Sequence, residues 1–151
     1  MSLFSKLAKI NYFEFESSSG EKSQTGWNGY AKGSVITKVE QDSIYFKEQG
    51  YFKLDKASRE AKIENEYIWQ KIDSNRIRLF HARFGYNNLV NLFDLVPKDK
   101  DSWHSENQHV CVDDLYSAEL SILDKSIELS WKIVGPKKNE LIKYMYLSKN
   151  S

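Results

Sequence analysis

The chain has 151 residues, which is the size of one ordinary domain and is large enough to bury a core without disulfide or metal staples. Hydrophobic residues make up 40% of the chain and aromatic residues 14%, a composition too apolar for a disordered protein. The 22 basic and 21 acidic residues leave a net charge of +1, which gives no electrostatic argument for nucleic acid or an anionic membrane as partner. We therefore expect a single domain over residues 1–151, with neither of these partners.

Residues 1–10 predict a short N-terminal helix. Leu3, Leu7 and Ile10 recur at helical spacing, and two lysines interrupt what would be the apolar region of a secretion signal. We expect this helix to plug or flank the domain. No apolar run in the sequence approaches the roughly 20 residues that a membrane-spanning helix needs.

From residue 11 onward the hydrophobic pattern has a period of two, which is typical of β-strands. It predicts about nine strands, at residues 13–16, 27–35, 44–54, 63–70, 76–79, 89–96, 109–123, 127–133 and 140–147. Short runs of Gly, Asp, Asn and Ser separate them, so consecutive strands can pair as hairpins. Because no helical segment is long enough for a crossover, the pattern predicts an all-β protein with antiparallel strands.

Such strands can form a sandwich or an up-and-down barrel, and we favour the barrel. The connections are short, and a closed barrel leaves no unprotected edge. Gly29, Ala31 and Gly33 also share the inward face of one strand, which suits a sharply coiled barrel strand. Residues 97–108 are polar, and we expect a plain surface loop there rather than a lid over the barrel mouth.

Polar residues fall on the predicted inner face of three strands. Glu48 and Asn65 are in phase with the apolar residues of their strands, and so are His81 and Arg83. An isolated buried charge is costly, so we expect Glu48 and Arg83 to pair or to face a wet cavity. One interpretation is a structural ion pair beside a core histidine. The other is a ligand pocket with these polar anchors and with aromatic walls, which Tyr67, Trp69 and Trp131 would form.

The single cysteine excludes an internal disulfide, and its neighbours argue against a catalytic role. Cys111 is flanked by valines, so we expect a packed thiol rather than a nucleophile, although His109 or His81 could serve as its base. His81, His109 and Cys111 have no metal-site spacing, and no metal is expected. The glycines match neither a phosphate loop nor a dinucleotide motif, so no cofactor is expected. Lys137 follows a Gly-Pro turn and could present charge to an anionic ligand.

Several of these blocks together resemble a small bacterial family of unknown function with a lipocalin-like, calycin-type barrel. The blocks lie between residues 12 and 147, and they are Glu48-Gln49-Gly50, Tyr67-Ile68-Trp69, the His81 strand, His109-Val110-Cys111 with Asp114-Leu115-Tyr116, and Trp131 with Gly135-Pro136-Lys137-Lys138 and Tyr144. The resemblance implies a lipocalin-like barrel and a set of pocket residues, but no reaction. Many lipocalins carry a Gly-x-Trp motif on their first strand, and its absence here favours a cytoplasmic relative. The predicted ligand-binding residues are Glu48, Tyr67, Trp69, His81, Arg83, His109, Tyr116, Trp131 and Lys137.

The sequence leaves three functions open. The preferred one is binding of a small amphipathic or carboxylate-bearing molecule inside the barrel. The second is an enzyme in which Glu48 acts as acid and base, Arg83 holds the substrate, and Tyr67 or Tyr116 adds a donor. The third is a packed barrel that serves as a protein-interaction module. The oligomeric state is open, with a homodimer as one option.

Overall fold

The computed structural model describes residues 2–20, 28–55, 59–106, 114–136 and 139–149, and the backbone of residues 109–111. Within these residues it contains one short helix and eleven strands. They are α1 (Leu3–Leu7), β1 (Tyr12–Ser19), β2 (Gly29–Glu40), β3 (Ser43–Leu54), β4 (Ala61–Asp73), β5 (Arg76–His81), β6 (Val90–Asp99), β7 (Ser102–Ser105), β8 (His109–Cys111), β9 (Asp114–Ile122), β10 (Ser126–Val134) and β11 (Asn139–Leu147). The predicted all-β class with a short N-terminal helix is therefore confirmed.

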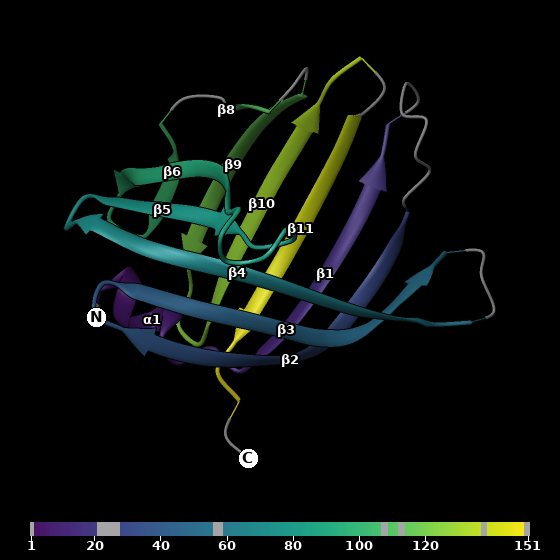
Figure 1. Cartoon of the computed structure of the whole chain (residues 1–151), viewed down its shortest axis with the longest axis horizontal. Helices are drawn as coiled ribbons and strands as arrows, with labels where there is room; N and C mark the ends of the chain where they lie inside the picture. Colours follow the sequence, from purple (N-terminus) through teal and green to yellow (C-terminus); the bar gives the residue numbers. More distant parts are fainter. Residues whose placement is uncertain are drawn as a thin grey trace.

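The strands form one closed antiparallel barrel (Figure 1). Each strand from β1 to β7 pairs with the next along the chain, β9 pairs with both β7 and β10, and β11 returns to β1. In the part of the chain that the structure describes, ten strands make the ring, and β8 adds to it by pairing with β9. The up-and-down barrel is thus confirmed, with ten strands in the ring where about nine were expected.

Two expectations about the middle of the chain are wrong. The polar segment 97–108 is not a plain loop, because β6 continues to Asp99 and β7 follows directly at Ser102. The pairing shifts between Pro97 and Asp99, and this irregularity accommodates the proline, while Trp103 on β7 is buried. The long strand expected at 109–123 is instead a hairpin of β8 and β9.

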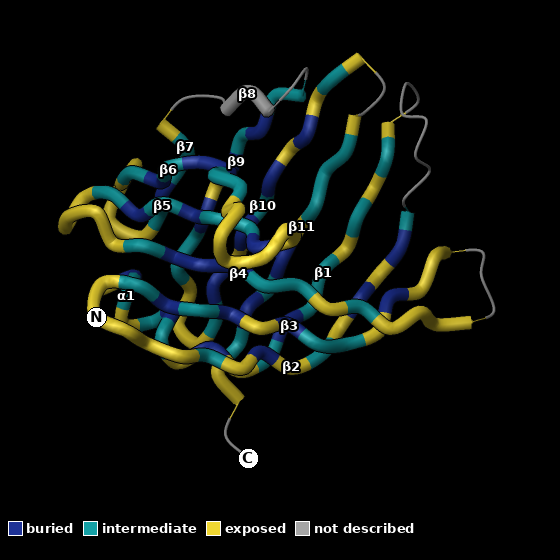
Figure 2. Tube along the Cα trace, viewed as in Figure 1, coloured by how far each residue is buried: buried dark blue, intermediate teal, exposed yellow. Residues whose placement is uncertain are grey.

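The helix α1 covers one end of the barrel, and Figure 2 shows that the chain is buried chiefly along the strands. Leu3, Leu7 and Ile10 are buried in the same apolar core as the strand residues. The Lys6 ammonium donates to the Leu123 carbonyl oxygen at 3.0 Å, which ties the helix to the β9–β10 turn. The helix therefore plugs the barrel, as expected, and no helix within the described residues is long and apolar enough to span a membrane.

Thr37 fastens the segment after α1 to β2. Its hydroxyl donates to the Ile10 carbonyl oxygen at 2.6 Å, and Thr37 itself is half-buried. Thr37→Val keeps the shape but leaves that carbonyl unpaired, so we expect a loss of about 1 kcal/mol in the free energy of unfolding, measured in urea. Lys38→Ala, on the exposed face of the same strand, is the control and should change it by less than about 0.5 kcal/mol. Equal unfolding free energies of Thr37→Val and Lys38→Ala would contradict a stabilising role for this hydrogen bond.

Candidate functional site

Glu48 lies in the barrel interior and is fully buried, as its phase in β3 predicts. Two tyrosines of β11 point at it from across the barrel. The Tyr144 hydroxyl donates to Glu48 Oε1 at 3.0 Å, and the Tyr146 hydroxyl donates to Glu48 Oε2 at 2.6 Å. Asn65, which lies opposite Glu48 in the β3–β4 register, adds a third side-chain hydrogen bond. The carboxyl group is therefore held by neutral donors from two sides.

Burial raises the pKa of Glu48 to about 7, because the charged form loses its hydration. The hydrogen bonds from Tyr146, Tyr144 and Asn65 act in the opposite direction, since they favour the carboxylate. No ion pair of Glu48 with a basic side chain occurs among the described residues. Glu48 consequently changes its charge close to neutral pH.

Arg83 forms no ion pair with Glu48 in the structure, and the expectation that both charges face the barrel interior, as a pair or in a wet cavity, is wrong for Arg83. Arg83 is exposed, and its guanidinium carbon lies 4.9 Å from the centroid of the Phe84 ring. The strand β5 ends at His81, which pairs with Tyr67, so the alternation of faces does not extend to Arg83. Ala82 is still buried and donates to the Glu66 carbonyl oxygen of β4 at 2.9 Å, and from Arg83 the chain is exposed as it passes through Gly85, whose φ of 87° lies in the left-handed region.

His81 faces the interior but carries no charge at neutral pH. Its ring stacks on Tyr67, with centroids 4.8 Å apart and an interplanar angle of 23°. Burial and, to a lesser degree, the positive charge of Arg83 together lower the pKa of His81 to about 4. The histidine is thus a neutral aromatic neighbour of Tyr67.

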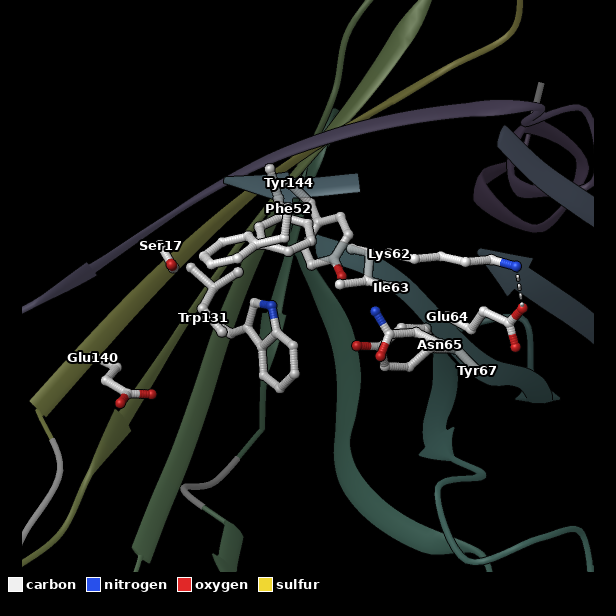
Figure 3. Close-up of a pocket in the computed structure, with 12 residues that line it drawn as sticks. Ser17, Phe52, Lys62, Ile63, Glu64, Asn65, Tyr67, Trp131, Glu140 and Tyr144 are labelled. Atoms are coloured by element: carbon white, nitrogen blue, oxygen red, sulfur yellow. Dashed lines mark ion pairs between the residues drawn. The ribbon is translucent and has the colours of Figure 1, made fainter. Parts of the chain in front are cut away.

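A cavity of about 540 Å³ lies next to this cluster, toward the barrel end away from α1 (Figure 3). The residues that line it are Phe15, Ser17, Phe52, Lys62, Ile63, Glu64, Asn65, Tyr67, Trp131, Glu140, Ile142 and Tyr144. Asn65 and Tyr144 belong both to this lining and to the contacts of Glu48. They form the cavity floor, and Glu48 lies immediately behind them.

The hydroxyl of Tyr67 connects the cavity to Glu48 through Tyr144. The two tyrosines share a side-chain hydrogen bond, and burial raises the pKa of both hydroxyls well above the ordinary value. Both are therefore protonated at neutral pH. Tyr144 in turn donates to Glu48, so a continuous chain of polar groups runs from Tyr67 at the cavity to the buried carboxyl group.

The other predicted aromatic residues divide between cavity and core. Tyr67 and Trp131 line the cavity, and their ring centroids are 6.5 Å apart. Tyr116 is buried beside Trp131, with centroids 6.4 Å apart. Trp69 is fully buried against Phe46 and is not among the described residues that line the cavity. The expectation that Trp69 forms a pocket wall is therefore wrong. Phe15 and Phe52 form walls instead, although the sequence pattern assigned both residues only to the core.

Three predicted residues have no described side chain. His109 and Cys111 belong to β8, of which the structure describes the backbone. Lys137 lies outside the described residues. The packed state of Cys111 therefore stays a prediction. Among the described side chains there is no group of three or more metal-ligating residues.

Tyr144 and Tyr146 are the residues whose role sequence reasoning missed. Their alternation in the last strand placed both on the inner face, and Tyr146 is 1% exposed. The missing information was their partner, since Glu48 lies 96 and 98 residues away in the sequence. Two tyrosines at positions i and i+2 on an inward face were the available signal, because a buried hydroxyl needs a hydrogen-bond partner.

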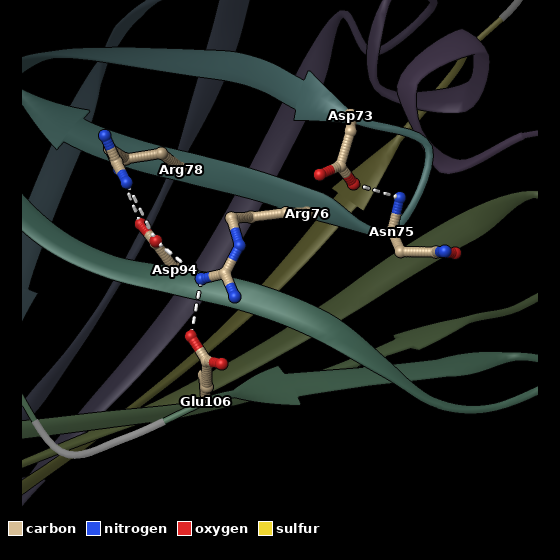
Figure 4. A network of polar contacts seen from close by, with 6 residues as sticks. All are labelled: Asp73, Asn75, Arg76, Arg78, Asp94 and Glu106. Carbon is tan, nitrogen blue, oxygen red and sulfur yellow. Dashed lines mark hydrogen bonds and ion pairs between the residues drawn. The ribbon is translucent and has the colours of Figure 1, made fainter.

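Opposite charges do form a network, but on the outer wall of the barrel (Figure 4). Asp94 of β6 accepts from Arg78 at 2.7 Å and from Arg76 at 2.8 Å, and Arg76 also reaches Glu106. The hydrogen bond from Arg78 is the main reason that the pKa of Asp94 is lowered. The outward phase of Arg76 and Arg78 follows from Ile77 and Leu79, which are buried. These pairs brace β5 against β6 and lie away from the cavity.

The fold and the site together define a closed β-barrel with an aromatic cavity over a buried carboxyl group. Residues 16–148 match DUF6314, a family of unknown function, and the chain belongs to this family. The expected membership of a family of unknown function with a barrel fold is therefore confirmed. A comparison with curated proteins finds no match.

Proposed function

We propose that this protein binds a small amphipathic molecule in the cavity at the open end of a lipocalin-like barrel. The observation that carries the proposal is the cavity of about 540 Å³, which has aromatic walls and a floor of a few polar groups. Its volume lies in the range of small-molecule sites, and this mixture of apolar walls and few polar anchors is typical of them. A barrel of eight or more strands can enclose one small ligand.

Trp131 provides independent support. Its side chain lines the cavity and is 7% exposed, and its indole Nε1–H is buried with no hydrogen-bond partner among the described residues. A buried donor that lacks an acceptor is costly, and native structures contain few of them. A bound molecule with an acceptor group beside Trp131 would satisfy this donor. The ligand that we propose therefore carries a hydrogen-bond acceptor.

Catalysis is a second candidate, and the pKa of Glu48 near 7 favours it. A general acid–base group works best when its pKa is close to the working pH. Glu48 is fully buried, so a proton would have to pass through Tyr144 and Tyr67 to reach a substrate. Binding remains our preferred proposal because it needs no proton transfer between Glu48 and the bound molecule. Native mass spectrometry distinguishes the two, since an enzyme releases its product whereas a carrier retains its ligand through purification.

Ile142→Trp is expected to block the cavity. Ile142 lines the cavity and is half-buried, so a larger side chain has room there without displacing the core. We expect at least about tenfold weaker binding of the neutral dye Nile red, measured by its fluorescence, which corresponds to about 1.4 kcal/mol. Ile36→Trp adds the same bulk on the outer wall, where Ile36 is 58% exposed, and should leave binding unchanged. Unaltered dye binding in the Ile142 variant would place the ligand elsewhere.

A further inference from the structure

The ionisable group at the cavity floor is a carboxyl group, and the positive charge of the exposed Arg83 acts on Tyr67 from outside the described lining. Glu48 lies behind the floor, and Glu140 lines the cavity on the same face of β11 as Tyr144. Lys62 is the one basic side chain in the described lining, and its ammonium lies 3.9 Å from the carboxylate of Glu64, with both side chains largely exposed. Figure 3 shows this pair turned away from the aromatic rings. Among the described residues that line the cavity, the one basic side chain is therefore already paired.

Aromatic rings surround the space above Glu48. The ring centroids of Phe15 and Tyr144 are 4.9 Å apart, those of Phe15 and Phe52 are 5.9 Å apart, and Tyr67 meets Trp131 edge to face. The faces of such rings carry negative potential and attract cations, especially where water is excluded. The aromatic walls and the carboxyl groups thus favour the same sign of charge in a ligand.

We infer that the ligand is an organic cation, such as an alkylammonium that also carries a hydrogen-bond acceptor for Trp131, and that its positive head lies at the cavity floor against Tyr67 and Tyr144. This inference rests on the proposed function and names the chemical class of its ligand. An anionic head would be repelled by the ionised Glu48, and a neutral head would gain no charge–charge attraction from it. The floor is the preferred place for the head because opposite charges attract most strongly away from water.

Binding of such a cation should release a proton. A positive charge beside Glu48 stabilises the carboxylate, so the protonated carboxyl group gives its proton to solvent, and no other bond changes. The starting pKa of about 7 means that the free protein is partly protonated at neutral pH. Below that pH, binding must first expel the proton, so the affinity for a permanent cation rises as the pH rises.

Three probes with the same chain length test this inference: octyltrimethylammonium, octan-1-ol and octanoate. Titration calorimetry with the wild-type protein should rank the cation tightest and octanoate weakest. Between about pH 6 and about pH 8 the affinity for the cation should rise about tenfold. At neutral pH, calorimetry in two buffers of different ionisation enthalpy measures the number of protons released on binding. We expect a fraction of one proton per molecule of cation bound and no proton release when octanol binds.

Glu48→Gln should abolish both the proton release and the rise in affinity, yet still bind octanol. Glu128→Gln makes the same change of charge at an exposed position on β10 and should behave as the wild type. Octanoate or octanol binding as tightly as the cation would overturn the inference and leave the proposed function standing. Failure of all three probes to bind would overturn the proposed function itself. The ranking and the proton count use the wild-type protein, so they stand even where a variant does not fold.

Discussion

Glu48→Gln is expected to flatten the dependence of folding stability on pH. The pKa of Glu48 is about 7 in the folded protein and 4.5 in its ordinary environment, so the folded state binds the proton more tightly. The stability that this proton contributes is fully present below about pH 4.5 and is lost as the pH rises through about 7. Each pKa unit corresponds to about 1.4 kcal/mol, so the whole change is about 3 kcal/mol.

Urea unfolding of the wild type and Glu48→Gln between about pH 4.5 and about pH 8 measures this effect. The difference between their unfolding free energies should shift by about 3 kcal/mol in favour of the variant over that interval. Glu128→Gln, exposed on β10, serves as the matched control and should run parallel to the wild type. If the unfolding free energies of Glu48→Gln and the wild type depend on pH in the same way, the pKa of Glu48 is ordinary in the folded protein. The burial and the hydrogen bonds of its carboxyl group would then differ from those in the structure.

The inner position of Glu48 was predictable because β3 is long and regularly paired. It keeps a continuous register with β2 and β4 over the residues around Glu48, so strict alternation assigns the face of each one. Arg83 shows the limit of the same reasoning. The pairing of β5 with β4 ends at His81, and beyond the last paired residue the chain no longer alternates between faces.

Contacts between distant strands were beyond the reach of the sequence pattern. Alternation placed Tyr144 and Tyr146 inside the barrel, but their approach to Glu48 depends on the closure of the ring by β11 and β1. The strand β7 was missed for a related reason. Its surroundings are polar, and the burial of Trp103 between β6 and β9 is a tertiary contact that outweighs the local composition.

Gly33→Ala should destabilise the barrel by about 3 kcal/mol or more. Gly33 of β2 lies directly opposite Gly50 of β3 in the register. A Cβ at Gly33 would collide with the Gln49 carbonyl oxygen and lie 2.6 Å from the Gly50 Cα. Both obstacles are backbone atoms of the neighbouring strand, so no change of side-chain rotamer relieves the overlap, and the two strands must move apart.

That movement would also disturb the site, because Glu48 is two residues from Gly50 and pairs with Val35 in the same ladder. We therefore expect Gly33→Ala to weaken binding of Nile red as well as stability in urea. Ser34→Ala, exposed on the outer face of β2, is the matched control and should stay within about 0.5 kcal/mol of the wild type. Wild-type stability of Gly33→Ala would mean that β2 and β3 approach less closely than in the structure.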